Sequence, residues 1–80
     1  MTIRQIIGEN IRGFRNILKL SQTEFAKRAH LNRSHLSSIE QGEENLTIDS
    51  LERIATILGV PIHVLLIEQS HTWARPKTDT

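Results

Sequence analysis

Apolar residues recur at steps of three and four along the start of the chain, and this spacing predicts an amphipathic helix from about residue 2 to residue 18. Its apolar stripe consists of Ile3, Ile7, Ile11, Phe14 and Leu18. The polar residues between them would face solvent, so this helix should cover one side of a small core.

The same spacing returns between residues 47 and 59. Thr47 is a suitable N-cap, and Asp49 would place a negative charge in the first turn, where the helix dipole favours it. The apolar stripe here is Leu51, Ile54, Ala55 and Leu58. Gly59 ends this helix, and Pro61 is suited to the first position of a short helix that reaches about Ile67.

Residues 21–42 predict two short helices joined by a tight turn. Ser21 and Glu24 form a capping-box pattern at the first helix, and Asn32 is a good N-cap for the second. Gly42 fits the left-handed residue that often ends a helix. The turn between the helices has room for only three or four residues around His30, which is the length of a DNA-binding helix-turn-helix.

The second of these helices carries small polar side chains and one arginine opposite its apolar positions, Leu36 and Ile39. An α-helix fits the major groove of DNA, and the first residues of a recognition helix contact base edges there. The candidate base-reading residues are Arg33, Ser34, Ser37 and Ser38. Arg33 is the sharpest of them, because its planar fork can bridge O6 and N7 of guanine. The spacing alone also fits an ordinary solvated helix face.

A longer pattern in the chain resembles the lambda-repressor/Cro-like (Xre-type) helix-turn-helix family over roughly residues 7–66. The matching positions are Ile11, Arg15, Leu20, Ser21, Gln22, Phe25, Ala26, Leu31, Asn32, Arg33, Ser34, Leu36, Ser37, Ile39, Glu40, Gly42, Leu51, Ile54, Ala55, Leu58, Gly59, Val60, Leu65 and Leu66. The resemblance implies an all-α fold of five helices, with the helix-turn-helix at helices 2 and 3, and it implies DNA binding.

The resemblance also implies roles for individual residues. Gln22 would touch phosphate and brace the recognition helix, while Arg15 and Glu40 would form a structural ion pair between helix 1 and the recognition helix. Asn45 and Thr47 would flank a helix N-terminus that meets phosphate, where backbone N–H groups bind an anion.

Four further residues bear on the end of helix 1 or on phosphate binding near this surface. The family often has glycine where Lys19 stands, which implies either a strained end to helix 1 or a helix 1 that ends differently. His35 is best explained as a phosphate contact or a surface residue. Glu43 and Glu44 would oppose phosphate binding unless they point outward or contact a partner.

The charge of the chain is unevenly distributed, although its formal net value is only +1. Residues 1–42 hold seven Lys and Arg against three acidic residues, and residues 43–80 hold three Lys and Arg against six acidic residues. The half that carries the helix-turn-helix is therefore basic, as phosphate binding requires.

Apolar residues lie almost consecutively between residues 60 and 67, so they cannot all face the core of one short helix. An exposed apolar patch of this kind often marks a protein interface. We expect a homodimer contact here, formed by Ile62, His63, Leu66 and Ile67. A dimer would place two recognition helices about 34 Å apart on a palindromic site. The alternative is that Trp73 folds back and covers part of the patch.

Eighty residues make one small domain, expected over residues 1–68, followed by a polar and flexible tail over residues 69–80. The chain has no cysteine, which suits a reducing cytoplasm, and no apolar run long enough for a signal core or a membrane span. The four histidines form no i,i+4 pair. We therefore expect no metal, no cofactor and no catalytic activity.

Two biological interpretations remain. The first is a transcriptional regulator, close in layout to the controller proteins of restriction–modification systems, whose version of the loop at residues 45–52 this chain resembles. Those proteins commonly have a basic residue where Glu44 stands. The second is an antitoxin that neutralises a toxin protein and regulates its own operon, for which only the tail around Trp73 could bind the toxin.

Overall fold

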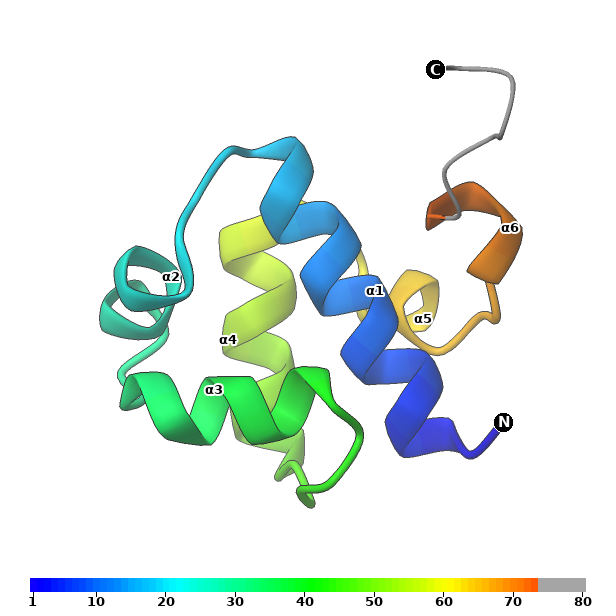
Figure 1. Cartoon of the computed structure of the whole chain (residues 1–80), viewed down its shortest axis with the longest axis horizontal. Helices are drawn as coiled ribbons and strands as arrows, with labels where there is room; N and C mark the ends of the chain where they lie inside the picture. The colour runs from blue at the N-terminus through cyan, green and yellow to red at the C-terminus, as the bar shows by residue number, and fades with distance from the viewer. Residues whose placement is uncertain (74–80) are drawn as a thin grey trace.

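The computed structural model describes residues 1–73, and it is entirely helical over that part of the chain. In chain order its helices are α1 Ile3–Ile17, α2 Gln22–Arg28, α3 Arg33–Glu40, α4 Ile48–Leu58, α5 Ile62–Leu65 and α6 Ser70–Trp73. Helix α1 runs between α2 and α3 on one side and α5 and α6 on the other (Figure 1). The all-α prediction is confirmed, and α6 is one short helix more than the five expected.

Capping explains where the predicted helices begin. The Thr2 hydroxyl accepts from the Gln5 backbone N–H, and the Gln5 side chain accepts from the Thr2 N–H, so a full capping box opens α1. Asn32 and Thr47 cap α3 and α4 as expected, through their side-chain oxygens. Each of these oxygens satisfies a backbone donor that has no partner within its own helix.

The capping box expected at Ser21 forms only in half. The Ser21 hydroxyl accepts from the Glu24 backbone N–H at 3.0 Å, but the Glu24 carboxylate lies 3.7 Å from Arg28 on the next turn of the helix. The i,i+4 arginine therefore draws this carboxylate along the surface of α2 and away from the cap.

Left-handed residues end several helices. Gly42 and Gly59 have φ of 77° and 74°, as their positions after α3 and α4 predicted. Lys19 and His30 also have positive φ, at 58° and 60°. The expectation of strain at Lys19 is therefore met, because a side chain there occupies a conformation that favours glycine.

One core joins the first five helices. Its fully buried large side chains are Phe25, Ile11, Leu36, Ile39, Ile54, Leu65 and the polar Asn10. Three small residues of the same cluster, Ala26, Ala29 and Ala55, are almost completely buried. The recognition helix is thus fixed to α1, α2 and α4 by one continuous apolar cluster.

Helix α5 is shorter than the sequence suggested. It was expected to reach about Ile67 with Pro61 as its first helical residue, but Pro61 is the N-cap and the helix ends at Leu65. The carbonyls of Leu65 and Ile67 accept hydrogen bonds from the Asn10 side chain instead of continuing the helical pattern. A contact distant in sequence therefore ends this helix.

The segment assigned to a polar tail contributes to the fold at its start. Trp73, on α6, stacks edge-to-face on Phe14 of α1, with ring centroids 4.8 Å apart. Trp73 thus folds back, but onto α1, and Leu66 and Ile67 of the apolar patch that it was expected to cover remain 39% and 52% exposed. Residues 74–80 of the predicted tail lie outside the described residues. Among residues 1–73 no helix combines the length and the apolar character that crossing a membrane demands.

Candidate nucleic-acid interface

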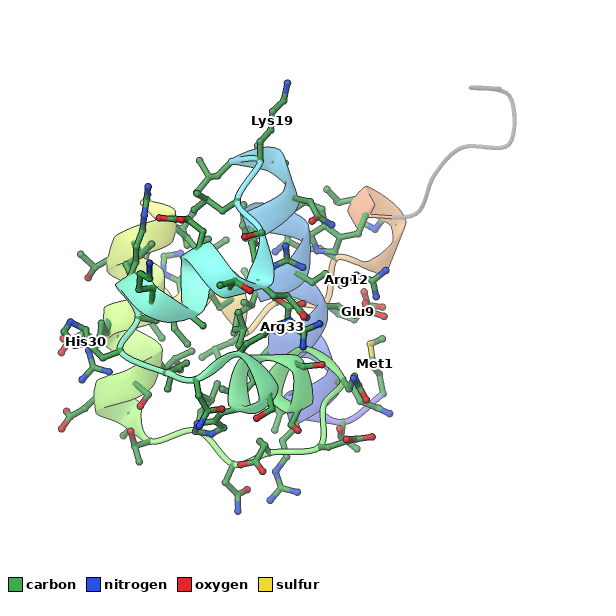
Figure 2. The ribbon with its side chains drawn as sticks, turned by 60° about the vertical axis from the view of Figure 1, so that its left-hand side comes forward. Met1, Glu9, Arg12, Lys19, His30 and Arg33 are labelled. Atoms are coloured by element: carbon green, nitrogen blue, oxygen red, sulfur yellow. The ribbon has the colours of Figure 1, made fainter. Side chains whose placement is uncertain are left out.

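The exposed face of α3 carries the four candidate base-reading residues. Arg33 and Ser34 are exposed in its first turn, and Ser37 and Ser38 are partly buried one turn later. Figure 2 shows the Arg33 side chain at the start of the helix, on the side of the molecule that is turned toward the reader. On the opposite face, Leu36 is completely buried against the core. The side chains therefore have the outward direction that reading a groove requires.

Short polar contacts organise this face. The Ser34 hydroxyl donates to the Asn32 side-chain oxygen at 3.0 Å, and the Gln41 amide donates to the Ser37 hydroxyl at 3.1 Å. Gln41 is exposed at the C-cap of α3 and belongs to the same polar surface. The sequence analysis missed it, although its i,i+4 relation to Ser37 was a signal that could have placed it there.

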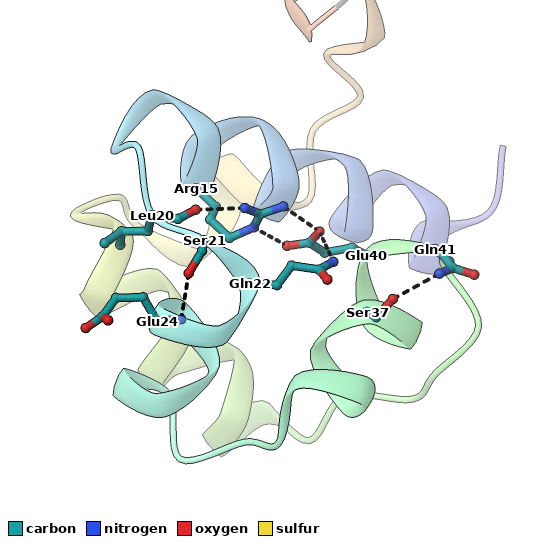
Figure 3. Close-up of polar contacts among 8 residues, drawn as sticks. All are labelled: Arg15, Leu20, Ser21, Gln22, Glu24, Ser37, Glu40 and Gln41. Carbon is teal, nitrogen blue, oxygen red and sulfur yellow. Dashed lines mark hydrogen bonds and ion pairs between the residues drawn. The ribbon is translucent and has the colours of Figure 1, made fainter.

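A buried ion pair holds α3 against α1. The Arg15 guanidinium donates to both carboxylate oxygens of Glu40, from Nε at 2.7 Å and from Nη2 at 3.0 Å. Its Nη1 donates to the Leu20 carbonyl at 2.7 Å. The two charged side chains are only 10% and 3% exposed, and the paired geometry satisfies both of them (Figure 3).

Gln22 connects α2 to this pair. Its side-chain nitrogen donates to Glu40 Oε1 at 3.0 Å, so three helices meet at one carboxylate (Figure 3). Gln22 is partly buried at the start of α2. It therefore has the position expected of a residue that braces the recognition helix.

The other candidate phosphate ligands lie around the loop between α3 and α4. His35 Nε2 is 3.3 Å from a carboxylate oxygen of Glu44. Asn45 is exposed, and the Thr47 hydroxyl is occupied by the capping contact with Ser50. The Glu44 carboxylate thus lies beside the recognition helix.

The predicted dimer residues gather in and just after α5, away from this loop. Leu66 and Ile67 are 39% and 52% exposed. His63 is exposed as well, whereas Ile62 is partly buried against the core. The structure therefore leaves part of the expected patch open to a partner and uses part of it to complete the fold.

Comparison with known proteins places these features in a family. A helix-turn-helix family profile matches residues 11–65. Control protein C.SmaI from Serratia marcescens is 38% identical over 69 residues, which cover 86% of this chain and 82% of that protein. The transcriptional regulator SinR from Bacillus subtilis is 37% identical over 68 residues, and the match spans 61% of its length.

Solved structures agree with the sequence relatives. A crystal structure of SinR in complex with DNA matches with a TM-score of 0.71 and 37% identity, over 76% of this chain and 98% of that one. The restriction-modification controller protein C.AhdI from Aeromonas hydrophila matches with a TM-score of 0.73 and 27% identity, over 78% of this chain and 94% of that one. The arrangement of α1 to α5 is thus shared with regulators of known structure.

Proposed function

The chain belongs to the Xre-type helix-turn-helix family of DNA-binding transcriptional regulators, and from this membership we propose that it binds a palindromic operator as a homodimer. The observation that carries the proposal is the outward polar face of α3, with exposed Arg33 in its first turn. The basic charge of residues 1–42 supports the same conclusion, since this half must approach phosphate.

Each polar residue has a role in this proposal. Arg33, Ser34, Ser37 and Ser38 read base edges, while phosphate is held by Gln22, His35, Asn45 and Thr47. The Arg15–Glu40 pair positions α3 and makes no base contact. No catalytic step and no cofactor is needed for this function.

The relatives favour a controller-type regulator. C.SmaI carries the name of a control protein, and this chain covers most of its length. We therefore infer that the protein acts on promoters as a controller-type regulator.

Arg33→Ala tests the base-reading role. We expect it to weaken binding to the operator by about 1–3 kcal/mol and to relax specificity at one base position. Gln22→Ala should instead weaken operator and random duplexes alike, because phosphate contacts carry no sequence information. Titrations of both variants on both duplexes measure the difference. Equal losses on the two duplexes for Arg33→Ala would remove Arg33 from the base-reading set.

Leu66→Asp tests the dimer contact. A charge placed on an exposed apolar interface must be desolvated when two copies meet, so we expect Leu66→Asp, and likewise Ile67→Asp, to shift the protein toward monomer in sedimentation velocity. Ile48→Asp is the control, since Ile48 is 77% exposed but lies at the start of α4. If both α5-side variants sediment as the wild type does, this face is not the interface.

Selection of random duplex DNA by the purified protein tests the function as a whole. We expect an enriched palindrome whose half-sites lie about one helical turn apart. A pool with no enriched motif would overturn sequence-specific regulation as the main activity. If the protein selects no motif and a second small protein co-purifies with it, the result would support the antitoxin interpretation, with a toxin as the partner.

A further inference from the structure

We propose that Asn10 and Trp73 are positioning residues for the homodimer contact, because together they fix the segment that carries Leu66 and Ile67. The inference rests on the homodimer proposed above and identifies what within each protomer prepares its surface. Neither residue needs to touch the second copy. Both act through the backbone that follows α5.

The Asn10 side chain holds this backbone on both sides of Leu66. Asn10 is 1% exposed, and its Nδ2 donates to the carbonyls of Leu65 and Ile67, each at 2.9 Å. The two hydrogens of the amide nitrogen are thereby used on carbonyls at the end of a helix, which lack helical partners. One side chain therefore fixes the short stretch from which Leu66 and Ile67 project.

Trp73 completes the bonding of this buried amide. Its indole Nε1 donates to Asn10 Oδ1 at 2.7 Å. The indole is a donor only, so it also determines which end of the amide faces α6 and which end faces the α5 carbonyls. Without the indole N–H, Oδ1 would be a buried acceptor with no partner, and such a group is costly.

The indole occupies a place that the surface of α1 leaves open. A Cβ atom on Gly13 would overlap the Trp73 ring, so any larger residue at this position would displace the ring. Phe14 contacts the ring edge-to-face, with an interplanar angle of 76°. Gln69 ties the connecting segment back to α5 by donating to the Val64 carbonyl at 2.9 Å. Docking of α6 is therefore specific in position and orientation.

The dimer dissociation constant depends on the fraction of protomers that hold Leu66 and Ile67 in the binding arrangement. A dimer contact forms only from protomers whose Leu66 and Ile67 side chains are held in the binding arrangement. If loss of the indole bond reduces that arrangement to about one third in each protomer, the dimer dissociation constant rises about tenfold, because both copies contribute the same factor. Global unfolding is not required for this effect.

Trp73→Phe is the sharpest test, because phenylalanine keeps an aromatic ring against Phe14 and removes the N–H. We expect sedimentation equilibrium to show a dimer dissociation constant raised about tenfold. Ile39→Val is the matched control: it removes buried volume from α3 and lowers the urea midpoint, but it leaves α5 and α6 untouched. We expect it to dimerise as the wild type does. If Trp73 acted only through the overall stability of the fold, Ile39→Val and Trp73→Phe would both weaken dimerisation.

Gly13→Ala provides a second variant that reaches the same contact from α1. We expect it to displace the ring and raise the dissociation constant to a similar degree, and the fluorescence of Trp73, the single tryptophan of the chain, reports the displacement directly. If Trp73→Phe and Gly13→Ala both have the dimer dissociation constant of the wild type, this inference is overturned but the homodimer is not. A wild-type protein that remains monomeric would overturn the homodimer itself, and this inference with it.

Discussion

Replacing Glu40 with alanine is expected to lower the free energy of unfolding by about 3–5 kcal/mol, because it leaves the buried Arg15 charge without its carboxylate. Arg15 is 8% exposed as a residue, so water cannot replace the lost oxygens. Its remaining hydrogen bond is to the Leu20 carbonyl, a single neutral acceptor. Gln22 loses its acceptor in the same substitution. A domain of this size holds only about 4–12 kcal/mol in total, so the variant should be close to unfolding.

Urea denaturation measures the effect, with Glu24→Ala as the control. Glu24 also pairs with an arginine, Arg28 on the next turn of α2, but the two side chains are 50% and 54% exposed and 3.7 Å apart. Such a surface pair contributes about 0.3–0.5 kcal/mol. The double variant Arg15→Met, Glu40→Leu should recover most of the loss, because it removes both buried charges. If Glu40→Ala and Glu24→Ala differ little, the ion pair is not what holds α3 to α1.

Local chemistry explains why much of the fold could be predicted from the sequence. Capping by Asn32 and Thr47, and the left-handed residues at Gly42 and Gly59, depend on a few neighbouring residues, and the structure confirms all four. The apolar spacing placed α1 and α4 to within a residue or two. The half-formed box at Ser21 shows the limit of such rules, because Arg28 competes for the Glu24 carboxylate.

Contacts between distant segments are what the sequence could not predict. Asn10 reads as an ordinary polar residue on α1, yet it is buried and joins segments 55, 57 and 63 positions away. Its partners determine where α5 ends and where Trp73 lies. For the candidate site, the sequence predicted the face of α3 but missed the Gln41–Ser37 bond and the approach of Glu44 to His35. The roles of these residues toward DNA stay predictions.

Gly8→Ala is expected to destabilise the protein by about 3 kcal/mol, at the upper end of what overpacking costs. A Cβ atom at this position would lie 2.5 Å from the Ile39 carbonyl oxygen and 2.7 Å from that of Glu40. Both obstructing atoms belong to backbone, so no side-chain rotation can relieve the contact. Helix α3 would have to move away from α1, which would also strain the ion pair that joins the same two helices.

The sign of this effect makes the test decisive. Helix propensity alone predicts that glycine to alanine inside a helix stabilises it by about 1 kcal/mol. Asn16→Ala, at an exposed position on the same helix, should raise stability only by the smaller difference in helix propensity between asparagine and alanine. A urea midpoint that falls for Gly8→Ala while rising for Asn16→Ala would show that α1 uses glycine to let α3 approach. A rise for both would mean that the two helices separate at little cost, and the Arg15–Glu40 pair would then have to position the recognition helix without close backbone packing.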